Sequence, residues 1–161
     1  MADSPDGKIE MLRHTLATLA YRGGKTLRGA PADFPAYGGA APQTPGRILA
    51  HLCDLFDWAL RLADGVHEWR ESAVGSWEED TARFFAGLEA FDRRLATGAP
   101  LGCAAERLFQ GPIADALTHV GQLAMLRRLA GASITGENYY VAAISAGRAG
   151  ADQASPLQEF S

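Results

Sequence analysis

The chain has 161 residues, of which 47% are hydrophobic and 21% are charged. This length fits one domain, and these proportions are those of an ordinary globular protein, so a disordered or fibrous architecture is excluded. The net charge of −4 comes without any run of basic residues, which argues against nucleic acid as a partner.

A first amphipathic helix is predicted over 8–27, where apolar residues recur at intervals of three and four. Gly23 and Gly24 weaken its last turns by about 1 kcal/mol each relative to alanine. The next segment, 30–43, holds three prolines and two glycines and cannot form regular structure. It is either a lid or pocket wall that carries Phe34 and Tyr37, or a plain connector.

A second helix is predicted from Pro45 to about Asp64, because Thr44 suits an N-cap and Pro45 suits the first helical position. Gly65 is a candidate C-cap for its end. A third helix opens with the capping-box pattern of Ser76 and the glutamate three residues later. It ends before the glycine and proline at 98 and 100.

The last third of the sequence predicts a short helical turn over 104–109 and then a fourth long helix. Pro112 would occupy the first position of this helix, which runs to about Ala130, before Gly131. A last short helix is predicted over 137–145. Sustained period-2 alternation is absent, so we expect an all-α four-helix bundle with a short extra C-terminal helix. This single domain covers 1–150, and 151–161 form a loose tail.

The compartment and the membrane relation follow from what the sequence lacks. It has no stretch of about 18 apolar residues and no signal-peptide pattern, so no membrane association is expected. Cys53 and Cys103 have no C-x-x-C spacing and are too few for a disulfide framework. We therefore expect a cytoplasmic protein.

The four histidines differ in the helix face they occupy. His14 points away from the apolar stripe of the first helix, and His67 follows the second helix, so a structural role suffices for both. His51 lies on the apolar stripe of the second helix, and His119 lies on the apolar stripe of the fourth. A buried imidazole needs a hydrogen-bond partner or a metal, because an unpaired one costs about 1–3 kcal/mol.

Asp115 lies four residues before His119, which places both on the same side of the fourth helix. Two imidazoles and one carboxylate, from His51, Asp115 and His119, can hold a divalent transition metal with open positions. Alternatively, the charge of Asp115 is neutralised by one of three arginines: Arg47, Arg127 or Arg128.

Asp54, three residues after His51, raises the alternative of a dinuclear site. Such sites usually need further glutamates from the other helices, and none is expected to point inward. One metal is therefore favoured, with Asp54 as a residue that supports the ligands or lies at the surface.

The segments 48–58 and 115–123, with the leucine-rich turn 126–131, resemble the DinB/YfiT-like proteins. The resemblance implies an up-down-down-up four-helix bundle, often a homodimer, with one divalent metal held by three histidines. By position, these ligands fall on His51, Asp115 and His119. The chain departs from the pattern at Asp115, where histidine is usual, and at Val120, where arginine is common. Gln122 is either a hydrogen-bond partner of a ligand or a polar flanking residue.

Family members with an assigned activity are metal-dependent transferases that use small thiols, and related proteins are thiol-dependent isomerases. The resemblance thus implies a small-molecule substrate, a divalent ion (Ni, Zn, Mn or Fe) and a low-molecular-weight thiol, which the metal would convert to a thiolate. A carboxylate ligand favours harder metals such as Mn or Fe(II). A hydrolase using metal-activated water is the other enzymatic interpretation. Cys53 lies about 200° away from His51 around the helix and is discounted as a nucleophile.

The competing hypothesis is a catalytically inert dimeric bundle that acts as a binding or interaction module. The fourth helix is apolar over more of its circumference than one core face requires, which favours a subunit interface. Under this hypothesis, His51→Ala would change stability by at most a few kcal/mol and leave partner binding intact.

Overall fold

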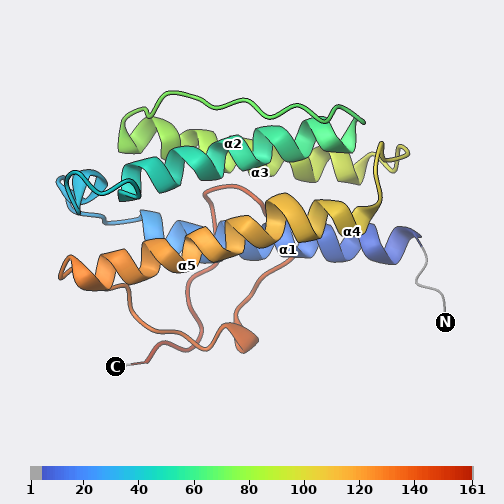
Figure 1. Ribbon diagram of the computed structural model, residues 1–161. Helices are drawn as coiled ribbons and strands as arrows, with labels where there is room; N and C mark the ends of the chain where they lie inside the picture. Colours follow the sequence, from blue (N-terminus) through green and yellow to red (C-terminus); the bar gives the residue numbers. More distant parts are fainter. Residues whose placement is uncertain (1–4, 161) are drawn as a thin grey trace.

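The structure is a computed structural model that describes residues 5–160, and it is all-helical, as predicted (Figure 1). Four long helical segments form a bundle, and the part of the chain described contains one isolated β-bridge and no strand. The helices are α1 (Pro5–Leu27), α2 (Pro45–Ala63), α3 (Trp77–Ala96), α4 (Ala105–Leu108) and α5 (Ala114–Leu129). None of the helices within 5–160 has the length and apolar character needed to cross a bilayer.

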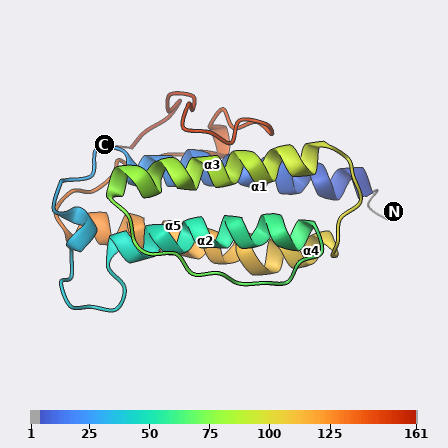
Figure 2. The same cartoon turned by 90° about the horizontal axis from the view of Figure 1, so that it is seen from above.

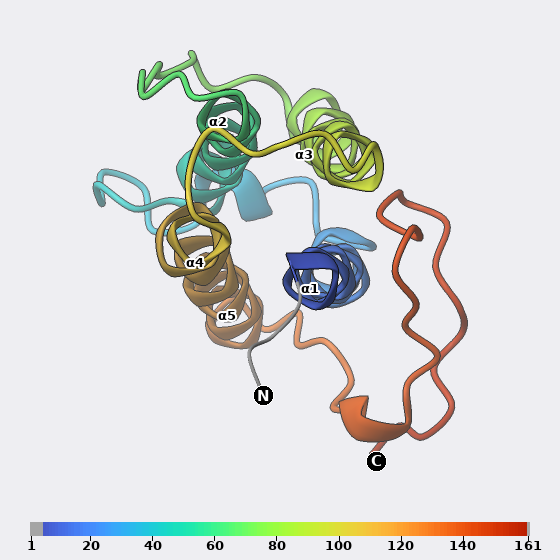
Figure 3. The same cartoon turned by 90° about the vertical axis from the view of Figure 1, so that its right-hand side faces the viewer.

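The bundle is square in cross-section, with α1 packed against α3 and α5, and α2 packed against the same two helices (Figure 3). Helices α1 and α5 run in one direction, and α2 and α3 run in the opposite one (Figure 1). Because α2 and α3 are parallel, the chain between them must return along the whole bundle. Residues 64–76 do so as an extended segment on the outside of α2 (Figures 1 and 2).

The helix starts follow the capping signals of the sequence. The Thr44 side chain accepts a hydrogen bond from the Arg47 amide at the start of α2. At the start of α3, Ser76 and Glu79 form both hydrogen bonds of a capping box. These bonds satisfy amides that would otherwise have no partner in the first turn. Gly65 follows α2 with a φ of +82°, a conformation that favours glycine and ends the helix.

The fourth long helix differs from the prediction. The turn expected over 104–109 and the helix expected to start at Pro112 are one continuous element, α4 and α5 joined by a π-helical turn, Phe109–Ile113. Pro112 therefore lies inside the helix. Proline has no amide proton and clashes with the preceding turn, and the wider π turn accommodates it without breaking the helix. This turn ends two residues before Asp115.

The core is a layer of leucine and phenylalanine side chains from all four helices. Phe84 of α3 is fully buried and packs edge-on against Phe56 of α2. Helix α1 approaches α3 closely at Gly23, where an added Cβ atom would lie 2.8 Å from the Phe84 ring. Gly23 thus permits the close packing of two helices.

The predicted helix over 137–145 is wrong, because only a single 3-10 turn forms there, at Tyr139–Val141. A segment this short is marginal as a helix, and its residues contact α1 in another conformation: Tyr139 packs edge-on against Tyr21, and Glu137 accepts hydrogen bonds from Tyr21 and Lys25. Residues 151–160, for which a loose tail is predicted, contact the preceding segment. Glu159 forms the β-bridge with Glu137 and an ion pair with Lys25 of α1, and the amide of Phe160 donates to the carbonyl of Gly136.

Candidate metal centre

His51, Asp115 and His119 meet at the interface of α2 and α5. His51 lies two turns into α2, while Asp115 and His119 lie one turn apart at the start of α5. Asp115 faces both imidazoles: its Oδ2 is 3.2 Å from His51 Nε2, and its Oδ1 is 3.4 Å from His119 Nε2. The two imidazole rings are 4.8 Å apart between centroids and nearly perpendicular.

One donor atom from each of the three residues lies within 4.8 Å of the other two. The site is at the rim of the bundle and not in its centre, since the His51, Asp115 and His119 side chains are 36%, 46% and 13% exposed. His51 is therefore more accessible than its apolar stripe predicts. An accessible site of this kind leaves room for an exchangeable ligand.

Gln122 contacts His119 on the side away from Asp115. The Nδ1 atom of His119 is 2.6 Å from Gln122 Oε1, and only the protonated nitrogen can donate to this oxygen. With the proton on Nδ1, the Nε2 atom of a neutral ring carries a lone pair. Of the two roles that the sequence left open for Gln122, the geometry thus matches the one that orients a ligand.

The arginines considered as partners of Asp115 do not fill that role. The buried Arg127 guanidinium instead donates to the carbonyls of Thr26, Arg28 and Gly29 at the end of α1. Within 5–160, the only lysine, arginine or histidine side chains with a nitrogen within 4.0 Å of the Asp115 carboxylate are the two histidines. With the tautomer set by Gln122, the Nε2 lone pair of His119 faces a carboxylate oxygen, an arrangement that a shared cation would stabilise.

A pocket of about 470 Å³ opens beside His51 and His119. One wall is the start of α2, with Arg47 and Ala50, and the other is the extended connection between α2 and α3, from Glu71 to Val74. Trp69 of the same connection lies 5.5 Å from the His51 ring. The volume is that of a small-molecule site.

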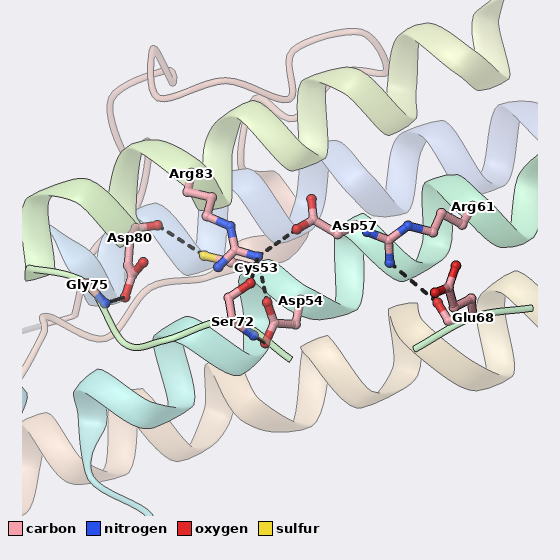
Figure 4. A network of polar contacts seen from close by, with 9 residues as sticks. All are labelled: Cys53, Asp54, Asp57, Arg61, Glu68, Ser72, Gly75, Asp80 and Arg83. Atoms are coloured by element: carbon pink, nitrogen blue, oxygen red, sulfur yellow. Dashed lines mark hydrogen bonds and ion pairs between the residues drawn. The ribbon is translucent and has the colours of Figure 1, made fainter. Parts of the chain in front are cut away.

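Asp54 lies three residues beyond His51 but does not join the histidines. It is buried, it accepts the Ser72 amide proton at 3.0 Å, and it pairs with Arg83 of α3 at 2.5 Å (Figure 4). Arg83 also donates to Asp57 and to the Ser72 hydroxyl. The carboxylate of Asp54 is thus neutralised and attaches the α2–α3 connection to the bundle, and it is not among the donor groups of the candidate metal centre.

The carboxylates of Asp54 and Asp57 stabilise the charged form of Arg83. Burial alone would lower the pKa of Arg83, but its hydrogen bonds to Asp57 and Asp54 outweigh this effect and raise the pKa well above the ordinary value. Arg83 therefore remains cationic. We call Asp54, Asp57, Ser72 and Arg83 the connection anchor.

Cys53 is no nucleophile. Its side chain is buried and its thiol donates to the carbonyl of Asp80. Burial raises the pKa of the Cys53 thiol to about 12, so the thiolate is scarce near neutral pH. The second cysteine, Cys103, is half-buried, and burial raises its pKa as well.

Sequence reasoning missed the α2–α3 connection as a wall of the pocket. Its residues have no helical or strand period, and only the parallel direction of α2 and α3 places them there. The loop 30–43 is partly a pocket wall and partly a connector packed on the core. Phe34 is buried against Trp77 as a core residue, whereas Pro42 and Gln43 of the same loop line the pocket.

Searches against protein-family models, curated proteins and solved structures returned no match for this chain.

Proposed function

We propose that the chain binds one divalent transition metal through His51, Asp115 and His119 and is a small metal-dependent enzyme of the DinB-like type. Two enzymatic activities fit this proposal: a thiol-dependent S-transferase and a metal-activated hydrolase. Both would use the same ion and the same pocket. The observation that carries the proposal is the convergence of three donor atoms from two helices within 4.8 Å.

The donor set fits such an ion. Two imidazoles and one carboxylate suit Mn, Fe, Ni and Zn, and three protein ligands leave positions for an exchangeable ligand. Gln122 orients His119 by the hydrogen bond that metal-ligating histidines usually make. The helix directions, with α2 and α3 opposite to α1 and α5, are those that the family resemblance implies (Figure 1).

The protein residues bind and orient, and the ion would supply the activation. When bound, it would lower the pKa of a coordinated thiol or water and so provide a nucleophile near neutral pH. Gln122 holds the ring of His119, and Asp115 would compensate the charge of a bound ion. Trp69 and the α2–α3 connection shield one side of His51 from water.

Metal titration of the purified, chelator-treated protein tests the proposal. We expect about one divalent ion per chain, and loss of tight binding in His119→Ala and Asp115→Ala, because each removes one of three ligands. His14→Ala is the matched control, since His14 is exposed on α1 and belongs neither to the donor group nor to the pocket lining. A wild-type protein that binds none of Mn, Fe(II), Ni and Zn would contradict the proposal.

A further inference from the structure

Arg47 is the one arginine among the residues that line the pocket beside His51 and His119. It lies one turn before His51 on α2, so both side chains belong to the same face of the helix. Arg47 is exposed, and its guanidinium has neither a hydrogen bond nor an ion pair with any residue in 5–160. The pocket thus contains an uncompensated cation next to the candidate metal ligands.

The stability of α2 does not account for this arginine. A cation in the first turn of a helix meets the positive end of the helix dipole, which is unfavourable, and no acidic residue of that turn offsets it. Asp115, considered above as a partner of Arg47, faces the two histidines instead. The five donors of a guanidinium suit a planar carboxylate, which they bind with two parallel hydrogen bonds.

The other charges of the pocket restrict the ligand further. Asp54 is neutralised by Arg83 in the connection anchor, so it contributes no free negative charge (Figure 4). Glu71, on the wall formed by the α2–α3 connection, has no ion pair in the described part of the chain. One free cation opposite one free anion disfavours a ligand with two negative charges.

We propose that the pocket takes a small organic molecule with a single carboxylate, which Arg47 binds while another part of the molecule reaches the metal position. This inference rests on the proposed function for the metal and adds to it the substrate class. The volume of about 470 Å³ is large enough for a small organic molecule.

Two probes that differ only in charge test the inference: 3-mercaptopropionate and its uncharged amide. Each is titrated into the cobalt-loaded protein, and binding is followed by the visible absorption of cobalt. A charge-assisted hydrogen-bond pair should make the acid bind about tenfold more tightly than the amide. In Arg47→Gln the two affinities should become equal, whereas Arg93→Gln, which removes an exposed arginine of α3 outside the pocket, should keep the preference.

The same probes are titrated into metal-free protein, with the Nε–Hε resonance of Arg47 as the readout. We expect a saturable shift with the acid and none with the amide. Failure to bind cobalt, Mn, Fe(II), Ni or Zn, together with this shift, would contradict the metal proposal alone. Cobalt binding with equal affinities for acid and amide, or an acid preference that survives in Arg47→Gln, would overturn the carboxylate site alone. If the protein binds no metal and the Arg47 resonance does not shift with the acid, both the metal proposal and the carboxylate site are overturned.

Discussion

At the scale of single residues, the orientation of His119 depends on Gln122. The two residues are one turn apart on α5, and their 2.6 Å hydrogen bond leaves Nε2 directed at Asp115. A ring held in this way loses less rotational freedom when it binds a metal, since its conformation is already set.

We predict that Gln122→Leu lowers metal affinity about 10–100-fold, because His119 loses the acceptor that fixes its tautomer. Gln122→Glu keeps an oxygen acceptor at the same place and should retain tight binding. Competition with a chromophoric chelator measures both affinities. Equal affinity in the wild type and Gln122→Leu would show that the hydrogen bond does not support a metal ligand.

At the scale of elements, the connection anchor holds the extended segment 64–76 against α2 and α3. Asp54 is 2% exposed, so removal of Arg83 leaves a buried carboxylate without its cation. We predict that Arg83→Met lowers the free energy of unfolding by on the order of 3 kcal/mol. Urea denaturation followed by tryptophan fluorescence measures this change.

Arg70→Met is the matched control for Arg83→Met. Arg70 belongs to the same connection, but its ion pair with Glu68 lies in solvent. Exposed pairs contribute little to stability, so the midpoint of unfolding should remain unchanged. Equal effects of the two substitutions would contradict the role of the connection anchor.

Two glycines within helices are expected to respond in opposite ways to alanine. Gly23→Ala places a methyl group 2.8 Å from the buried Phe84 ring, and we predict a loss of about 1–3 kcal/mol despite the better helix propensity of alanine. Gly121→Ala on α5 meets nothing within 4 Å, so it should gain up to about 1 kcal/mol. Thermal or urea unfolding distinguishes the two signs. A stabilised Gly23→Ala would show that α1 and α3 pack less closely than described.

Local chemistry explains which elements the sequence could predict. Thr44 and Ser76 mark helix starts because each side chain accepts a hydrogen bond from a backbone amide only three residues later, so the signal lies within the local sequence. The π turn around Pro112 could not be predicted, since the surrounding bundle decides whether a proline starts a helix or is accommodated within it. The helix predicted over 137–145 failed for a related reason, because contacts of Glu137 and Tyr139 with α1 hold the segment in another conformation.

At the scale of the whole molecule, the parallel course of α2 and α3 determines the shape of the site. It forces a long return connection, and this connection forms the outer wall of the pocket (Figures 1 and 2). The three candidate ligands could be predicted because spacing alone places each on a defined helix face. The wall could not, because it depends on contacts between Ser72 and residues of two other elements.

The hypothesis of a dimeric module also belongs to this scale. Part of the apolar excess on the fourth helix is buried within the chain, at Ile113 and Val120, while Met125 and Leu129 are exposed. A homodimer thus remains a prediction.

Anomalous X-ray diffraction from crystals of the manganese- or zinc-loaded protein tests the metal centre most directly. We expect a single strong peak about 2.0–2.2 Å from the Nε2 atoms of His51 and His119 and from a carboxylate oxygen of Asp115. Loaded crystals without a peak among these three side chains, or with a peak on other residues alone, would contradict it.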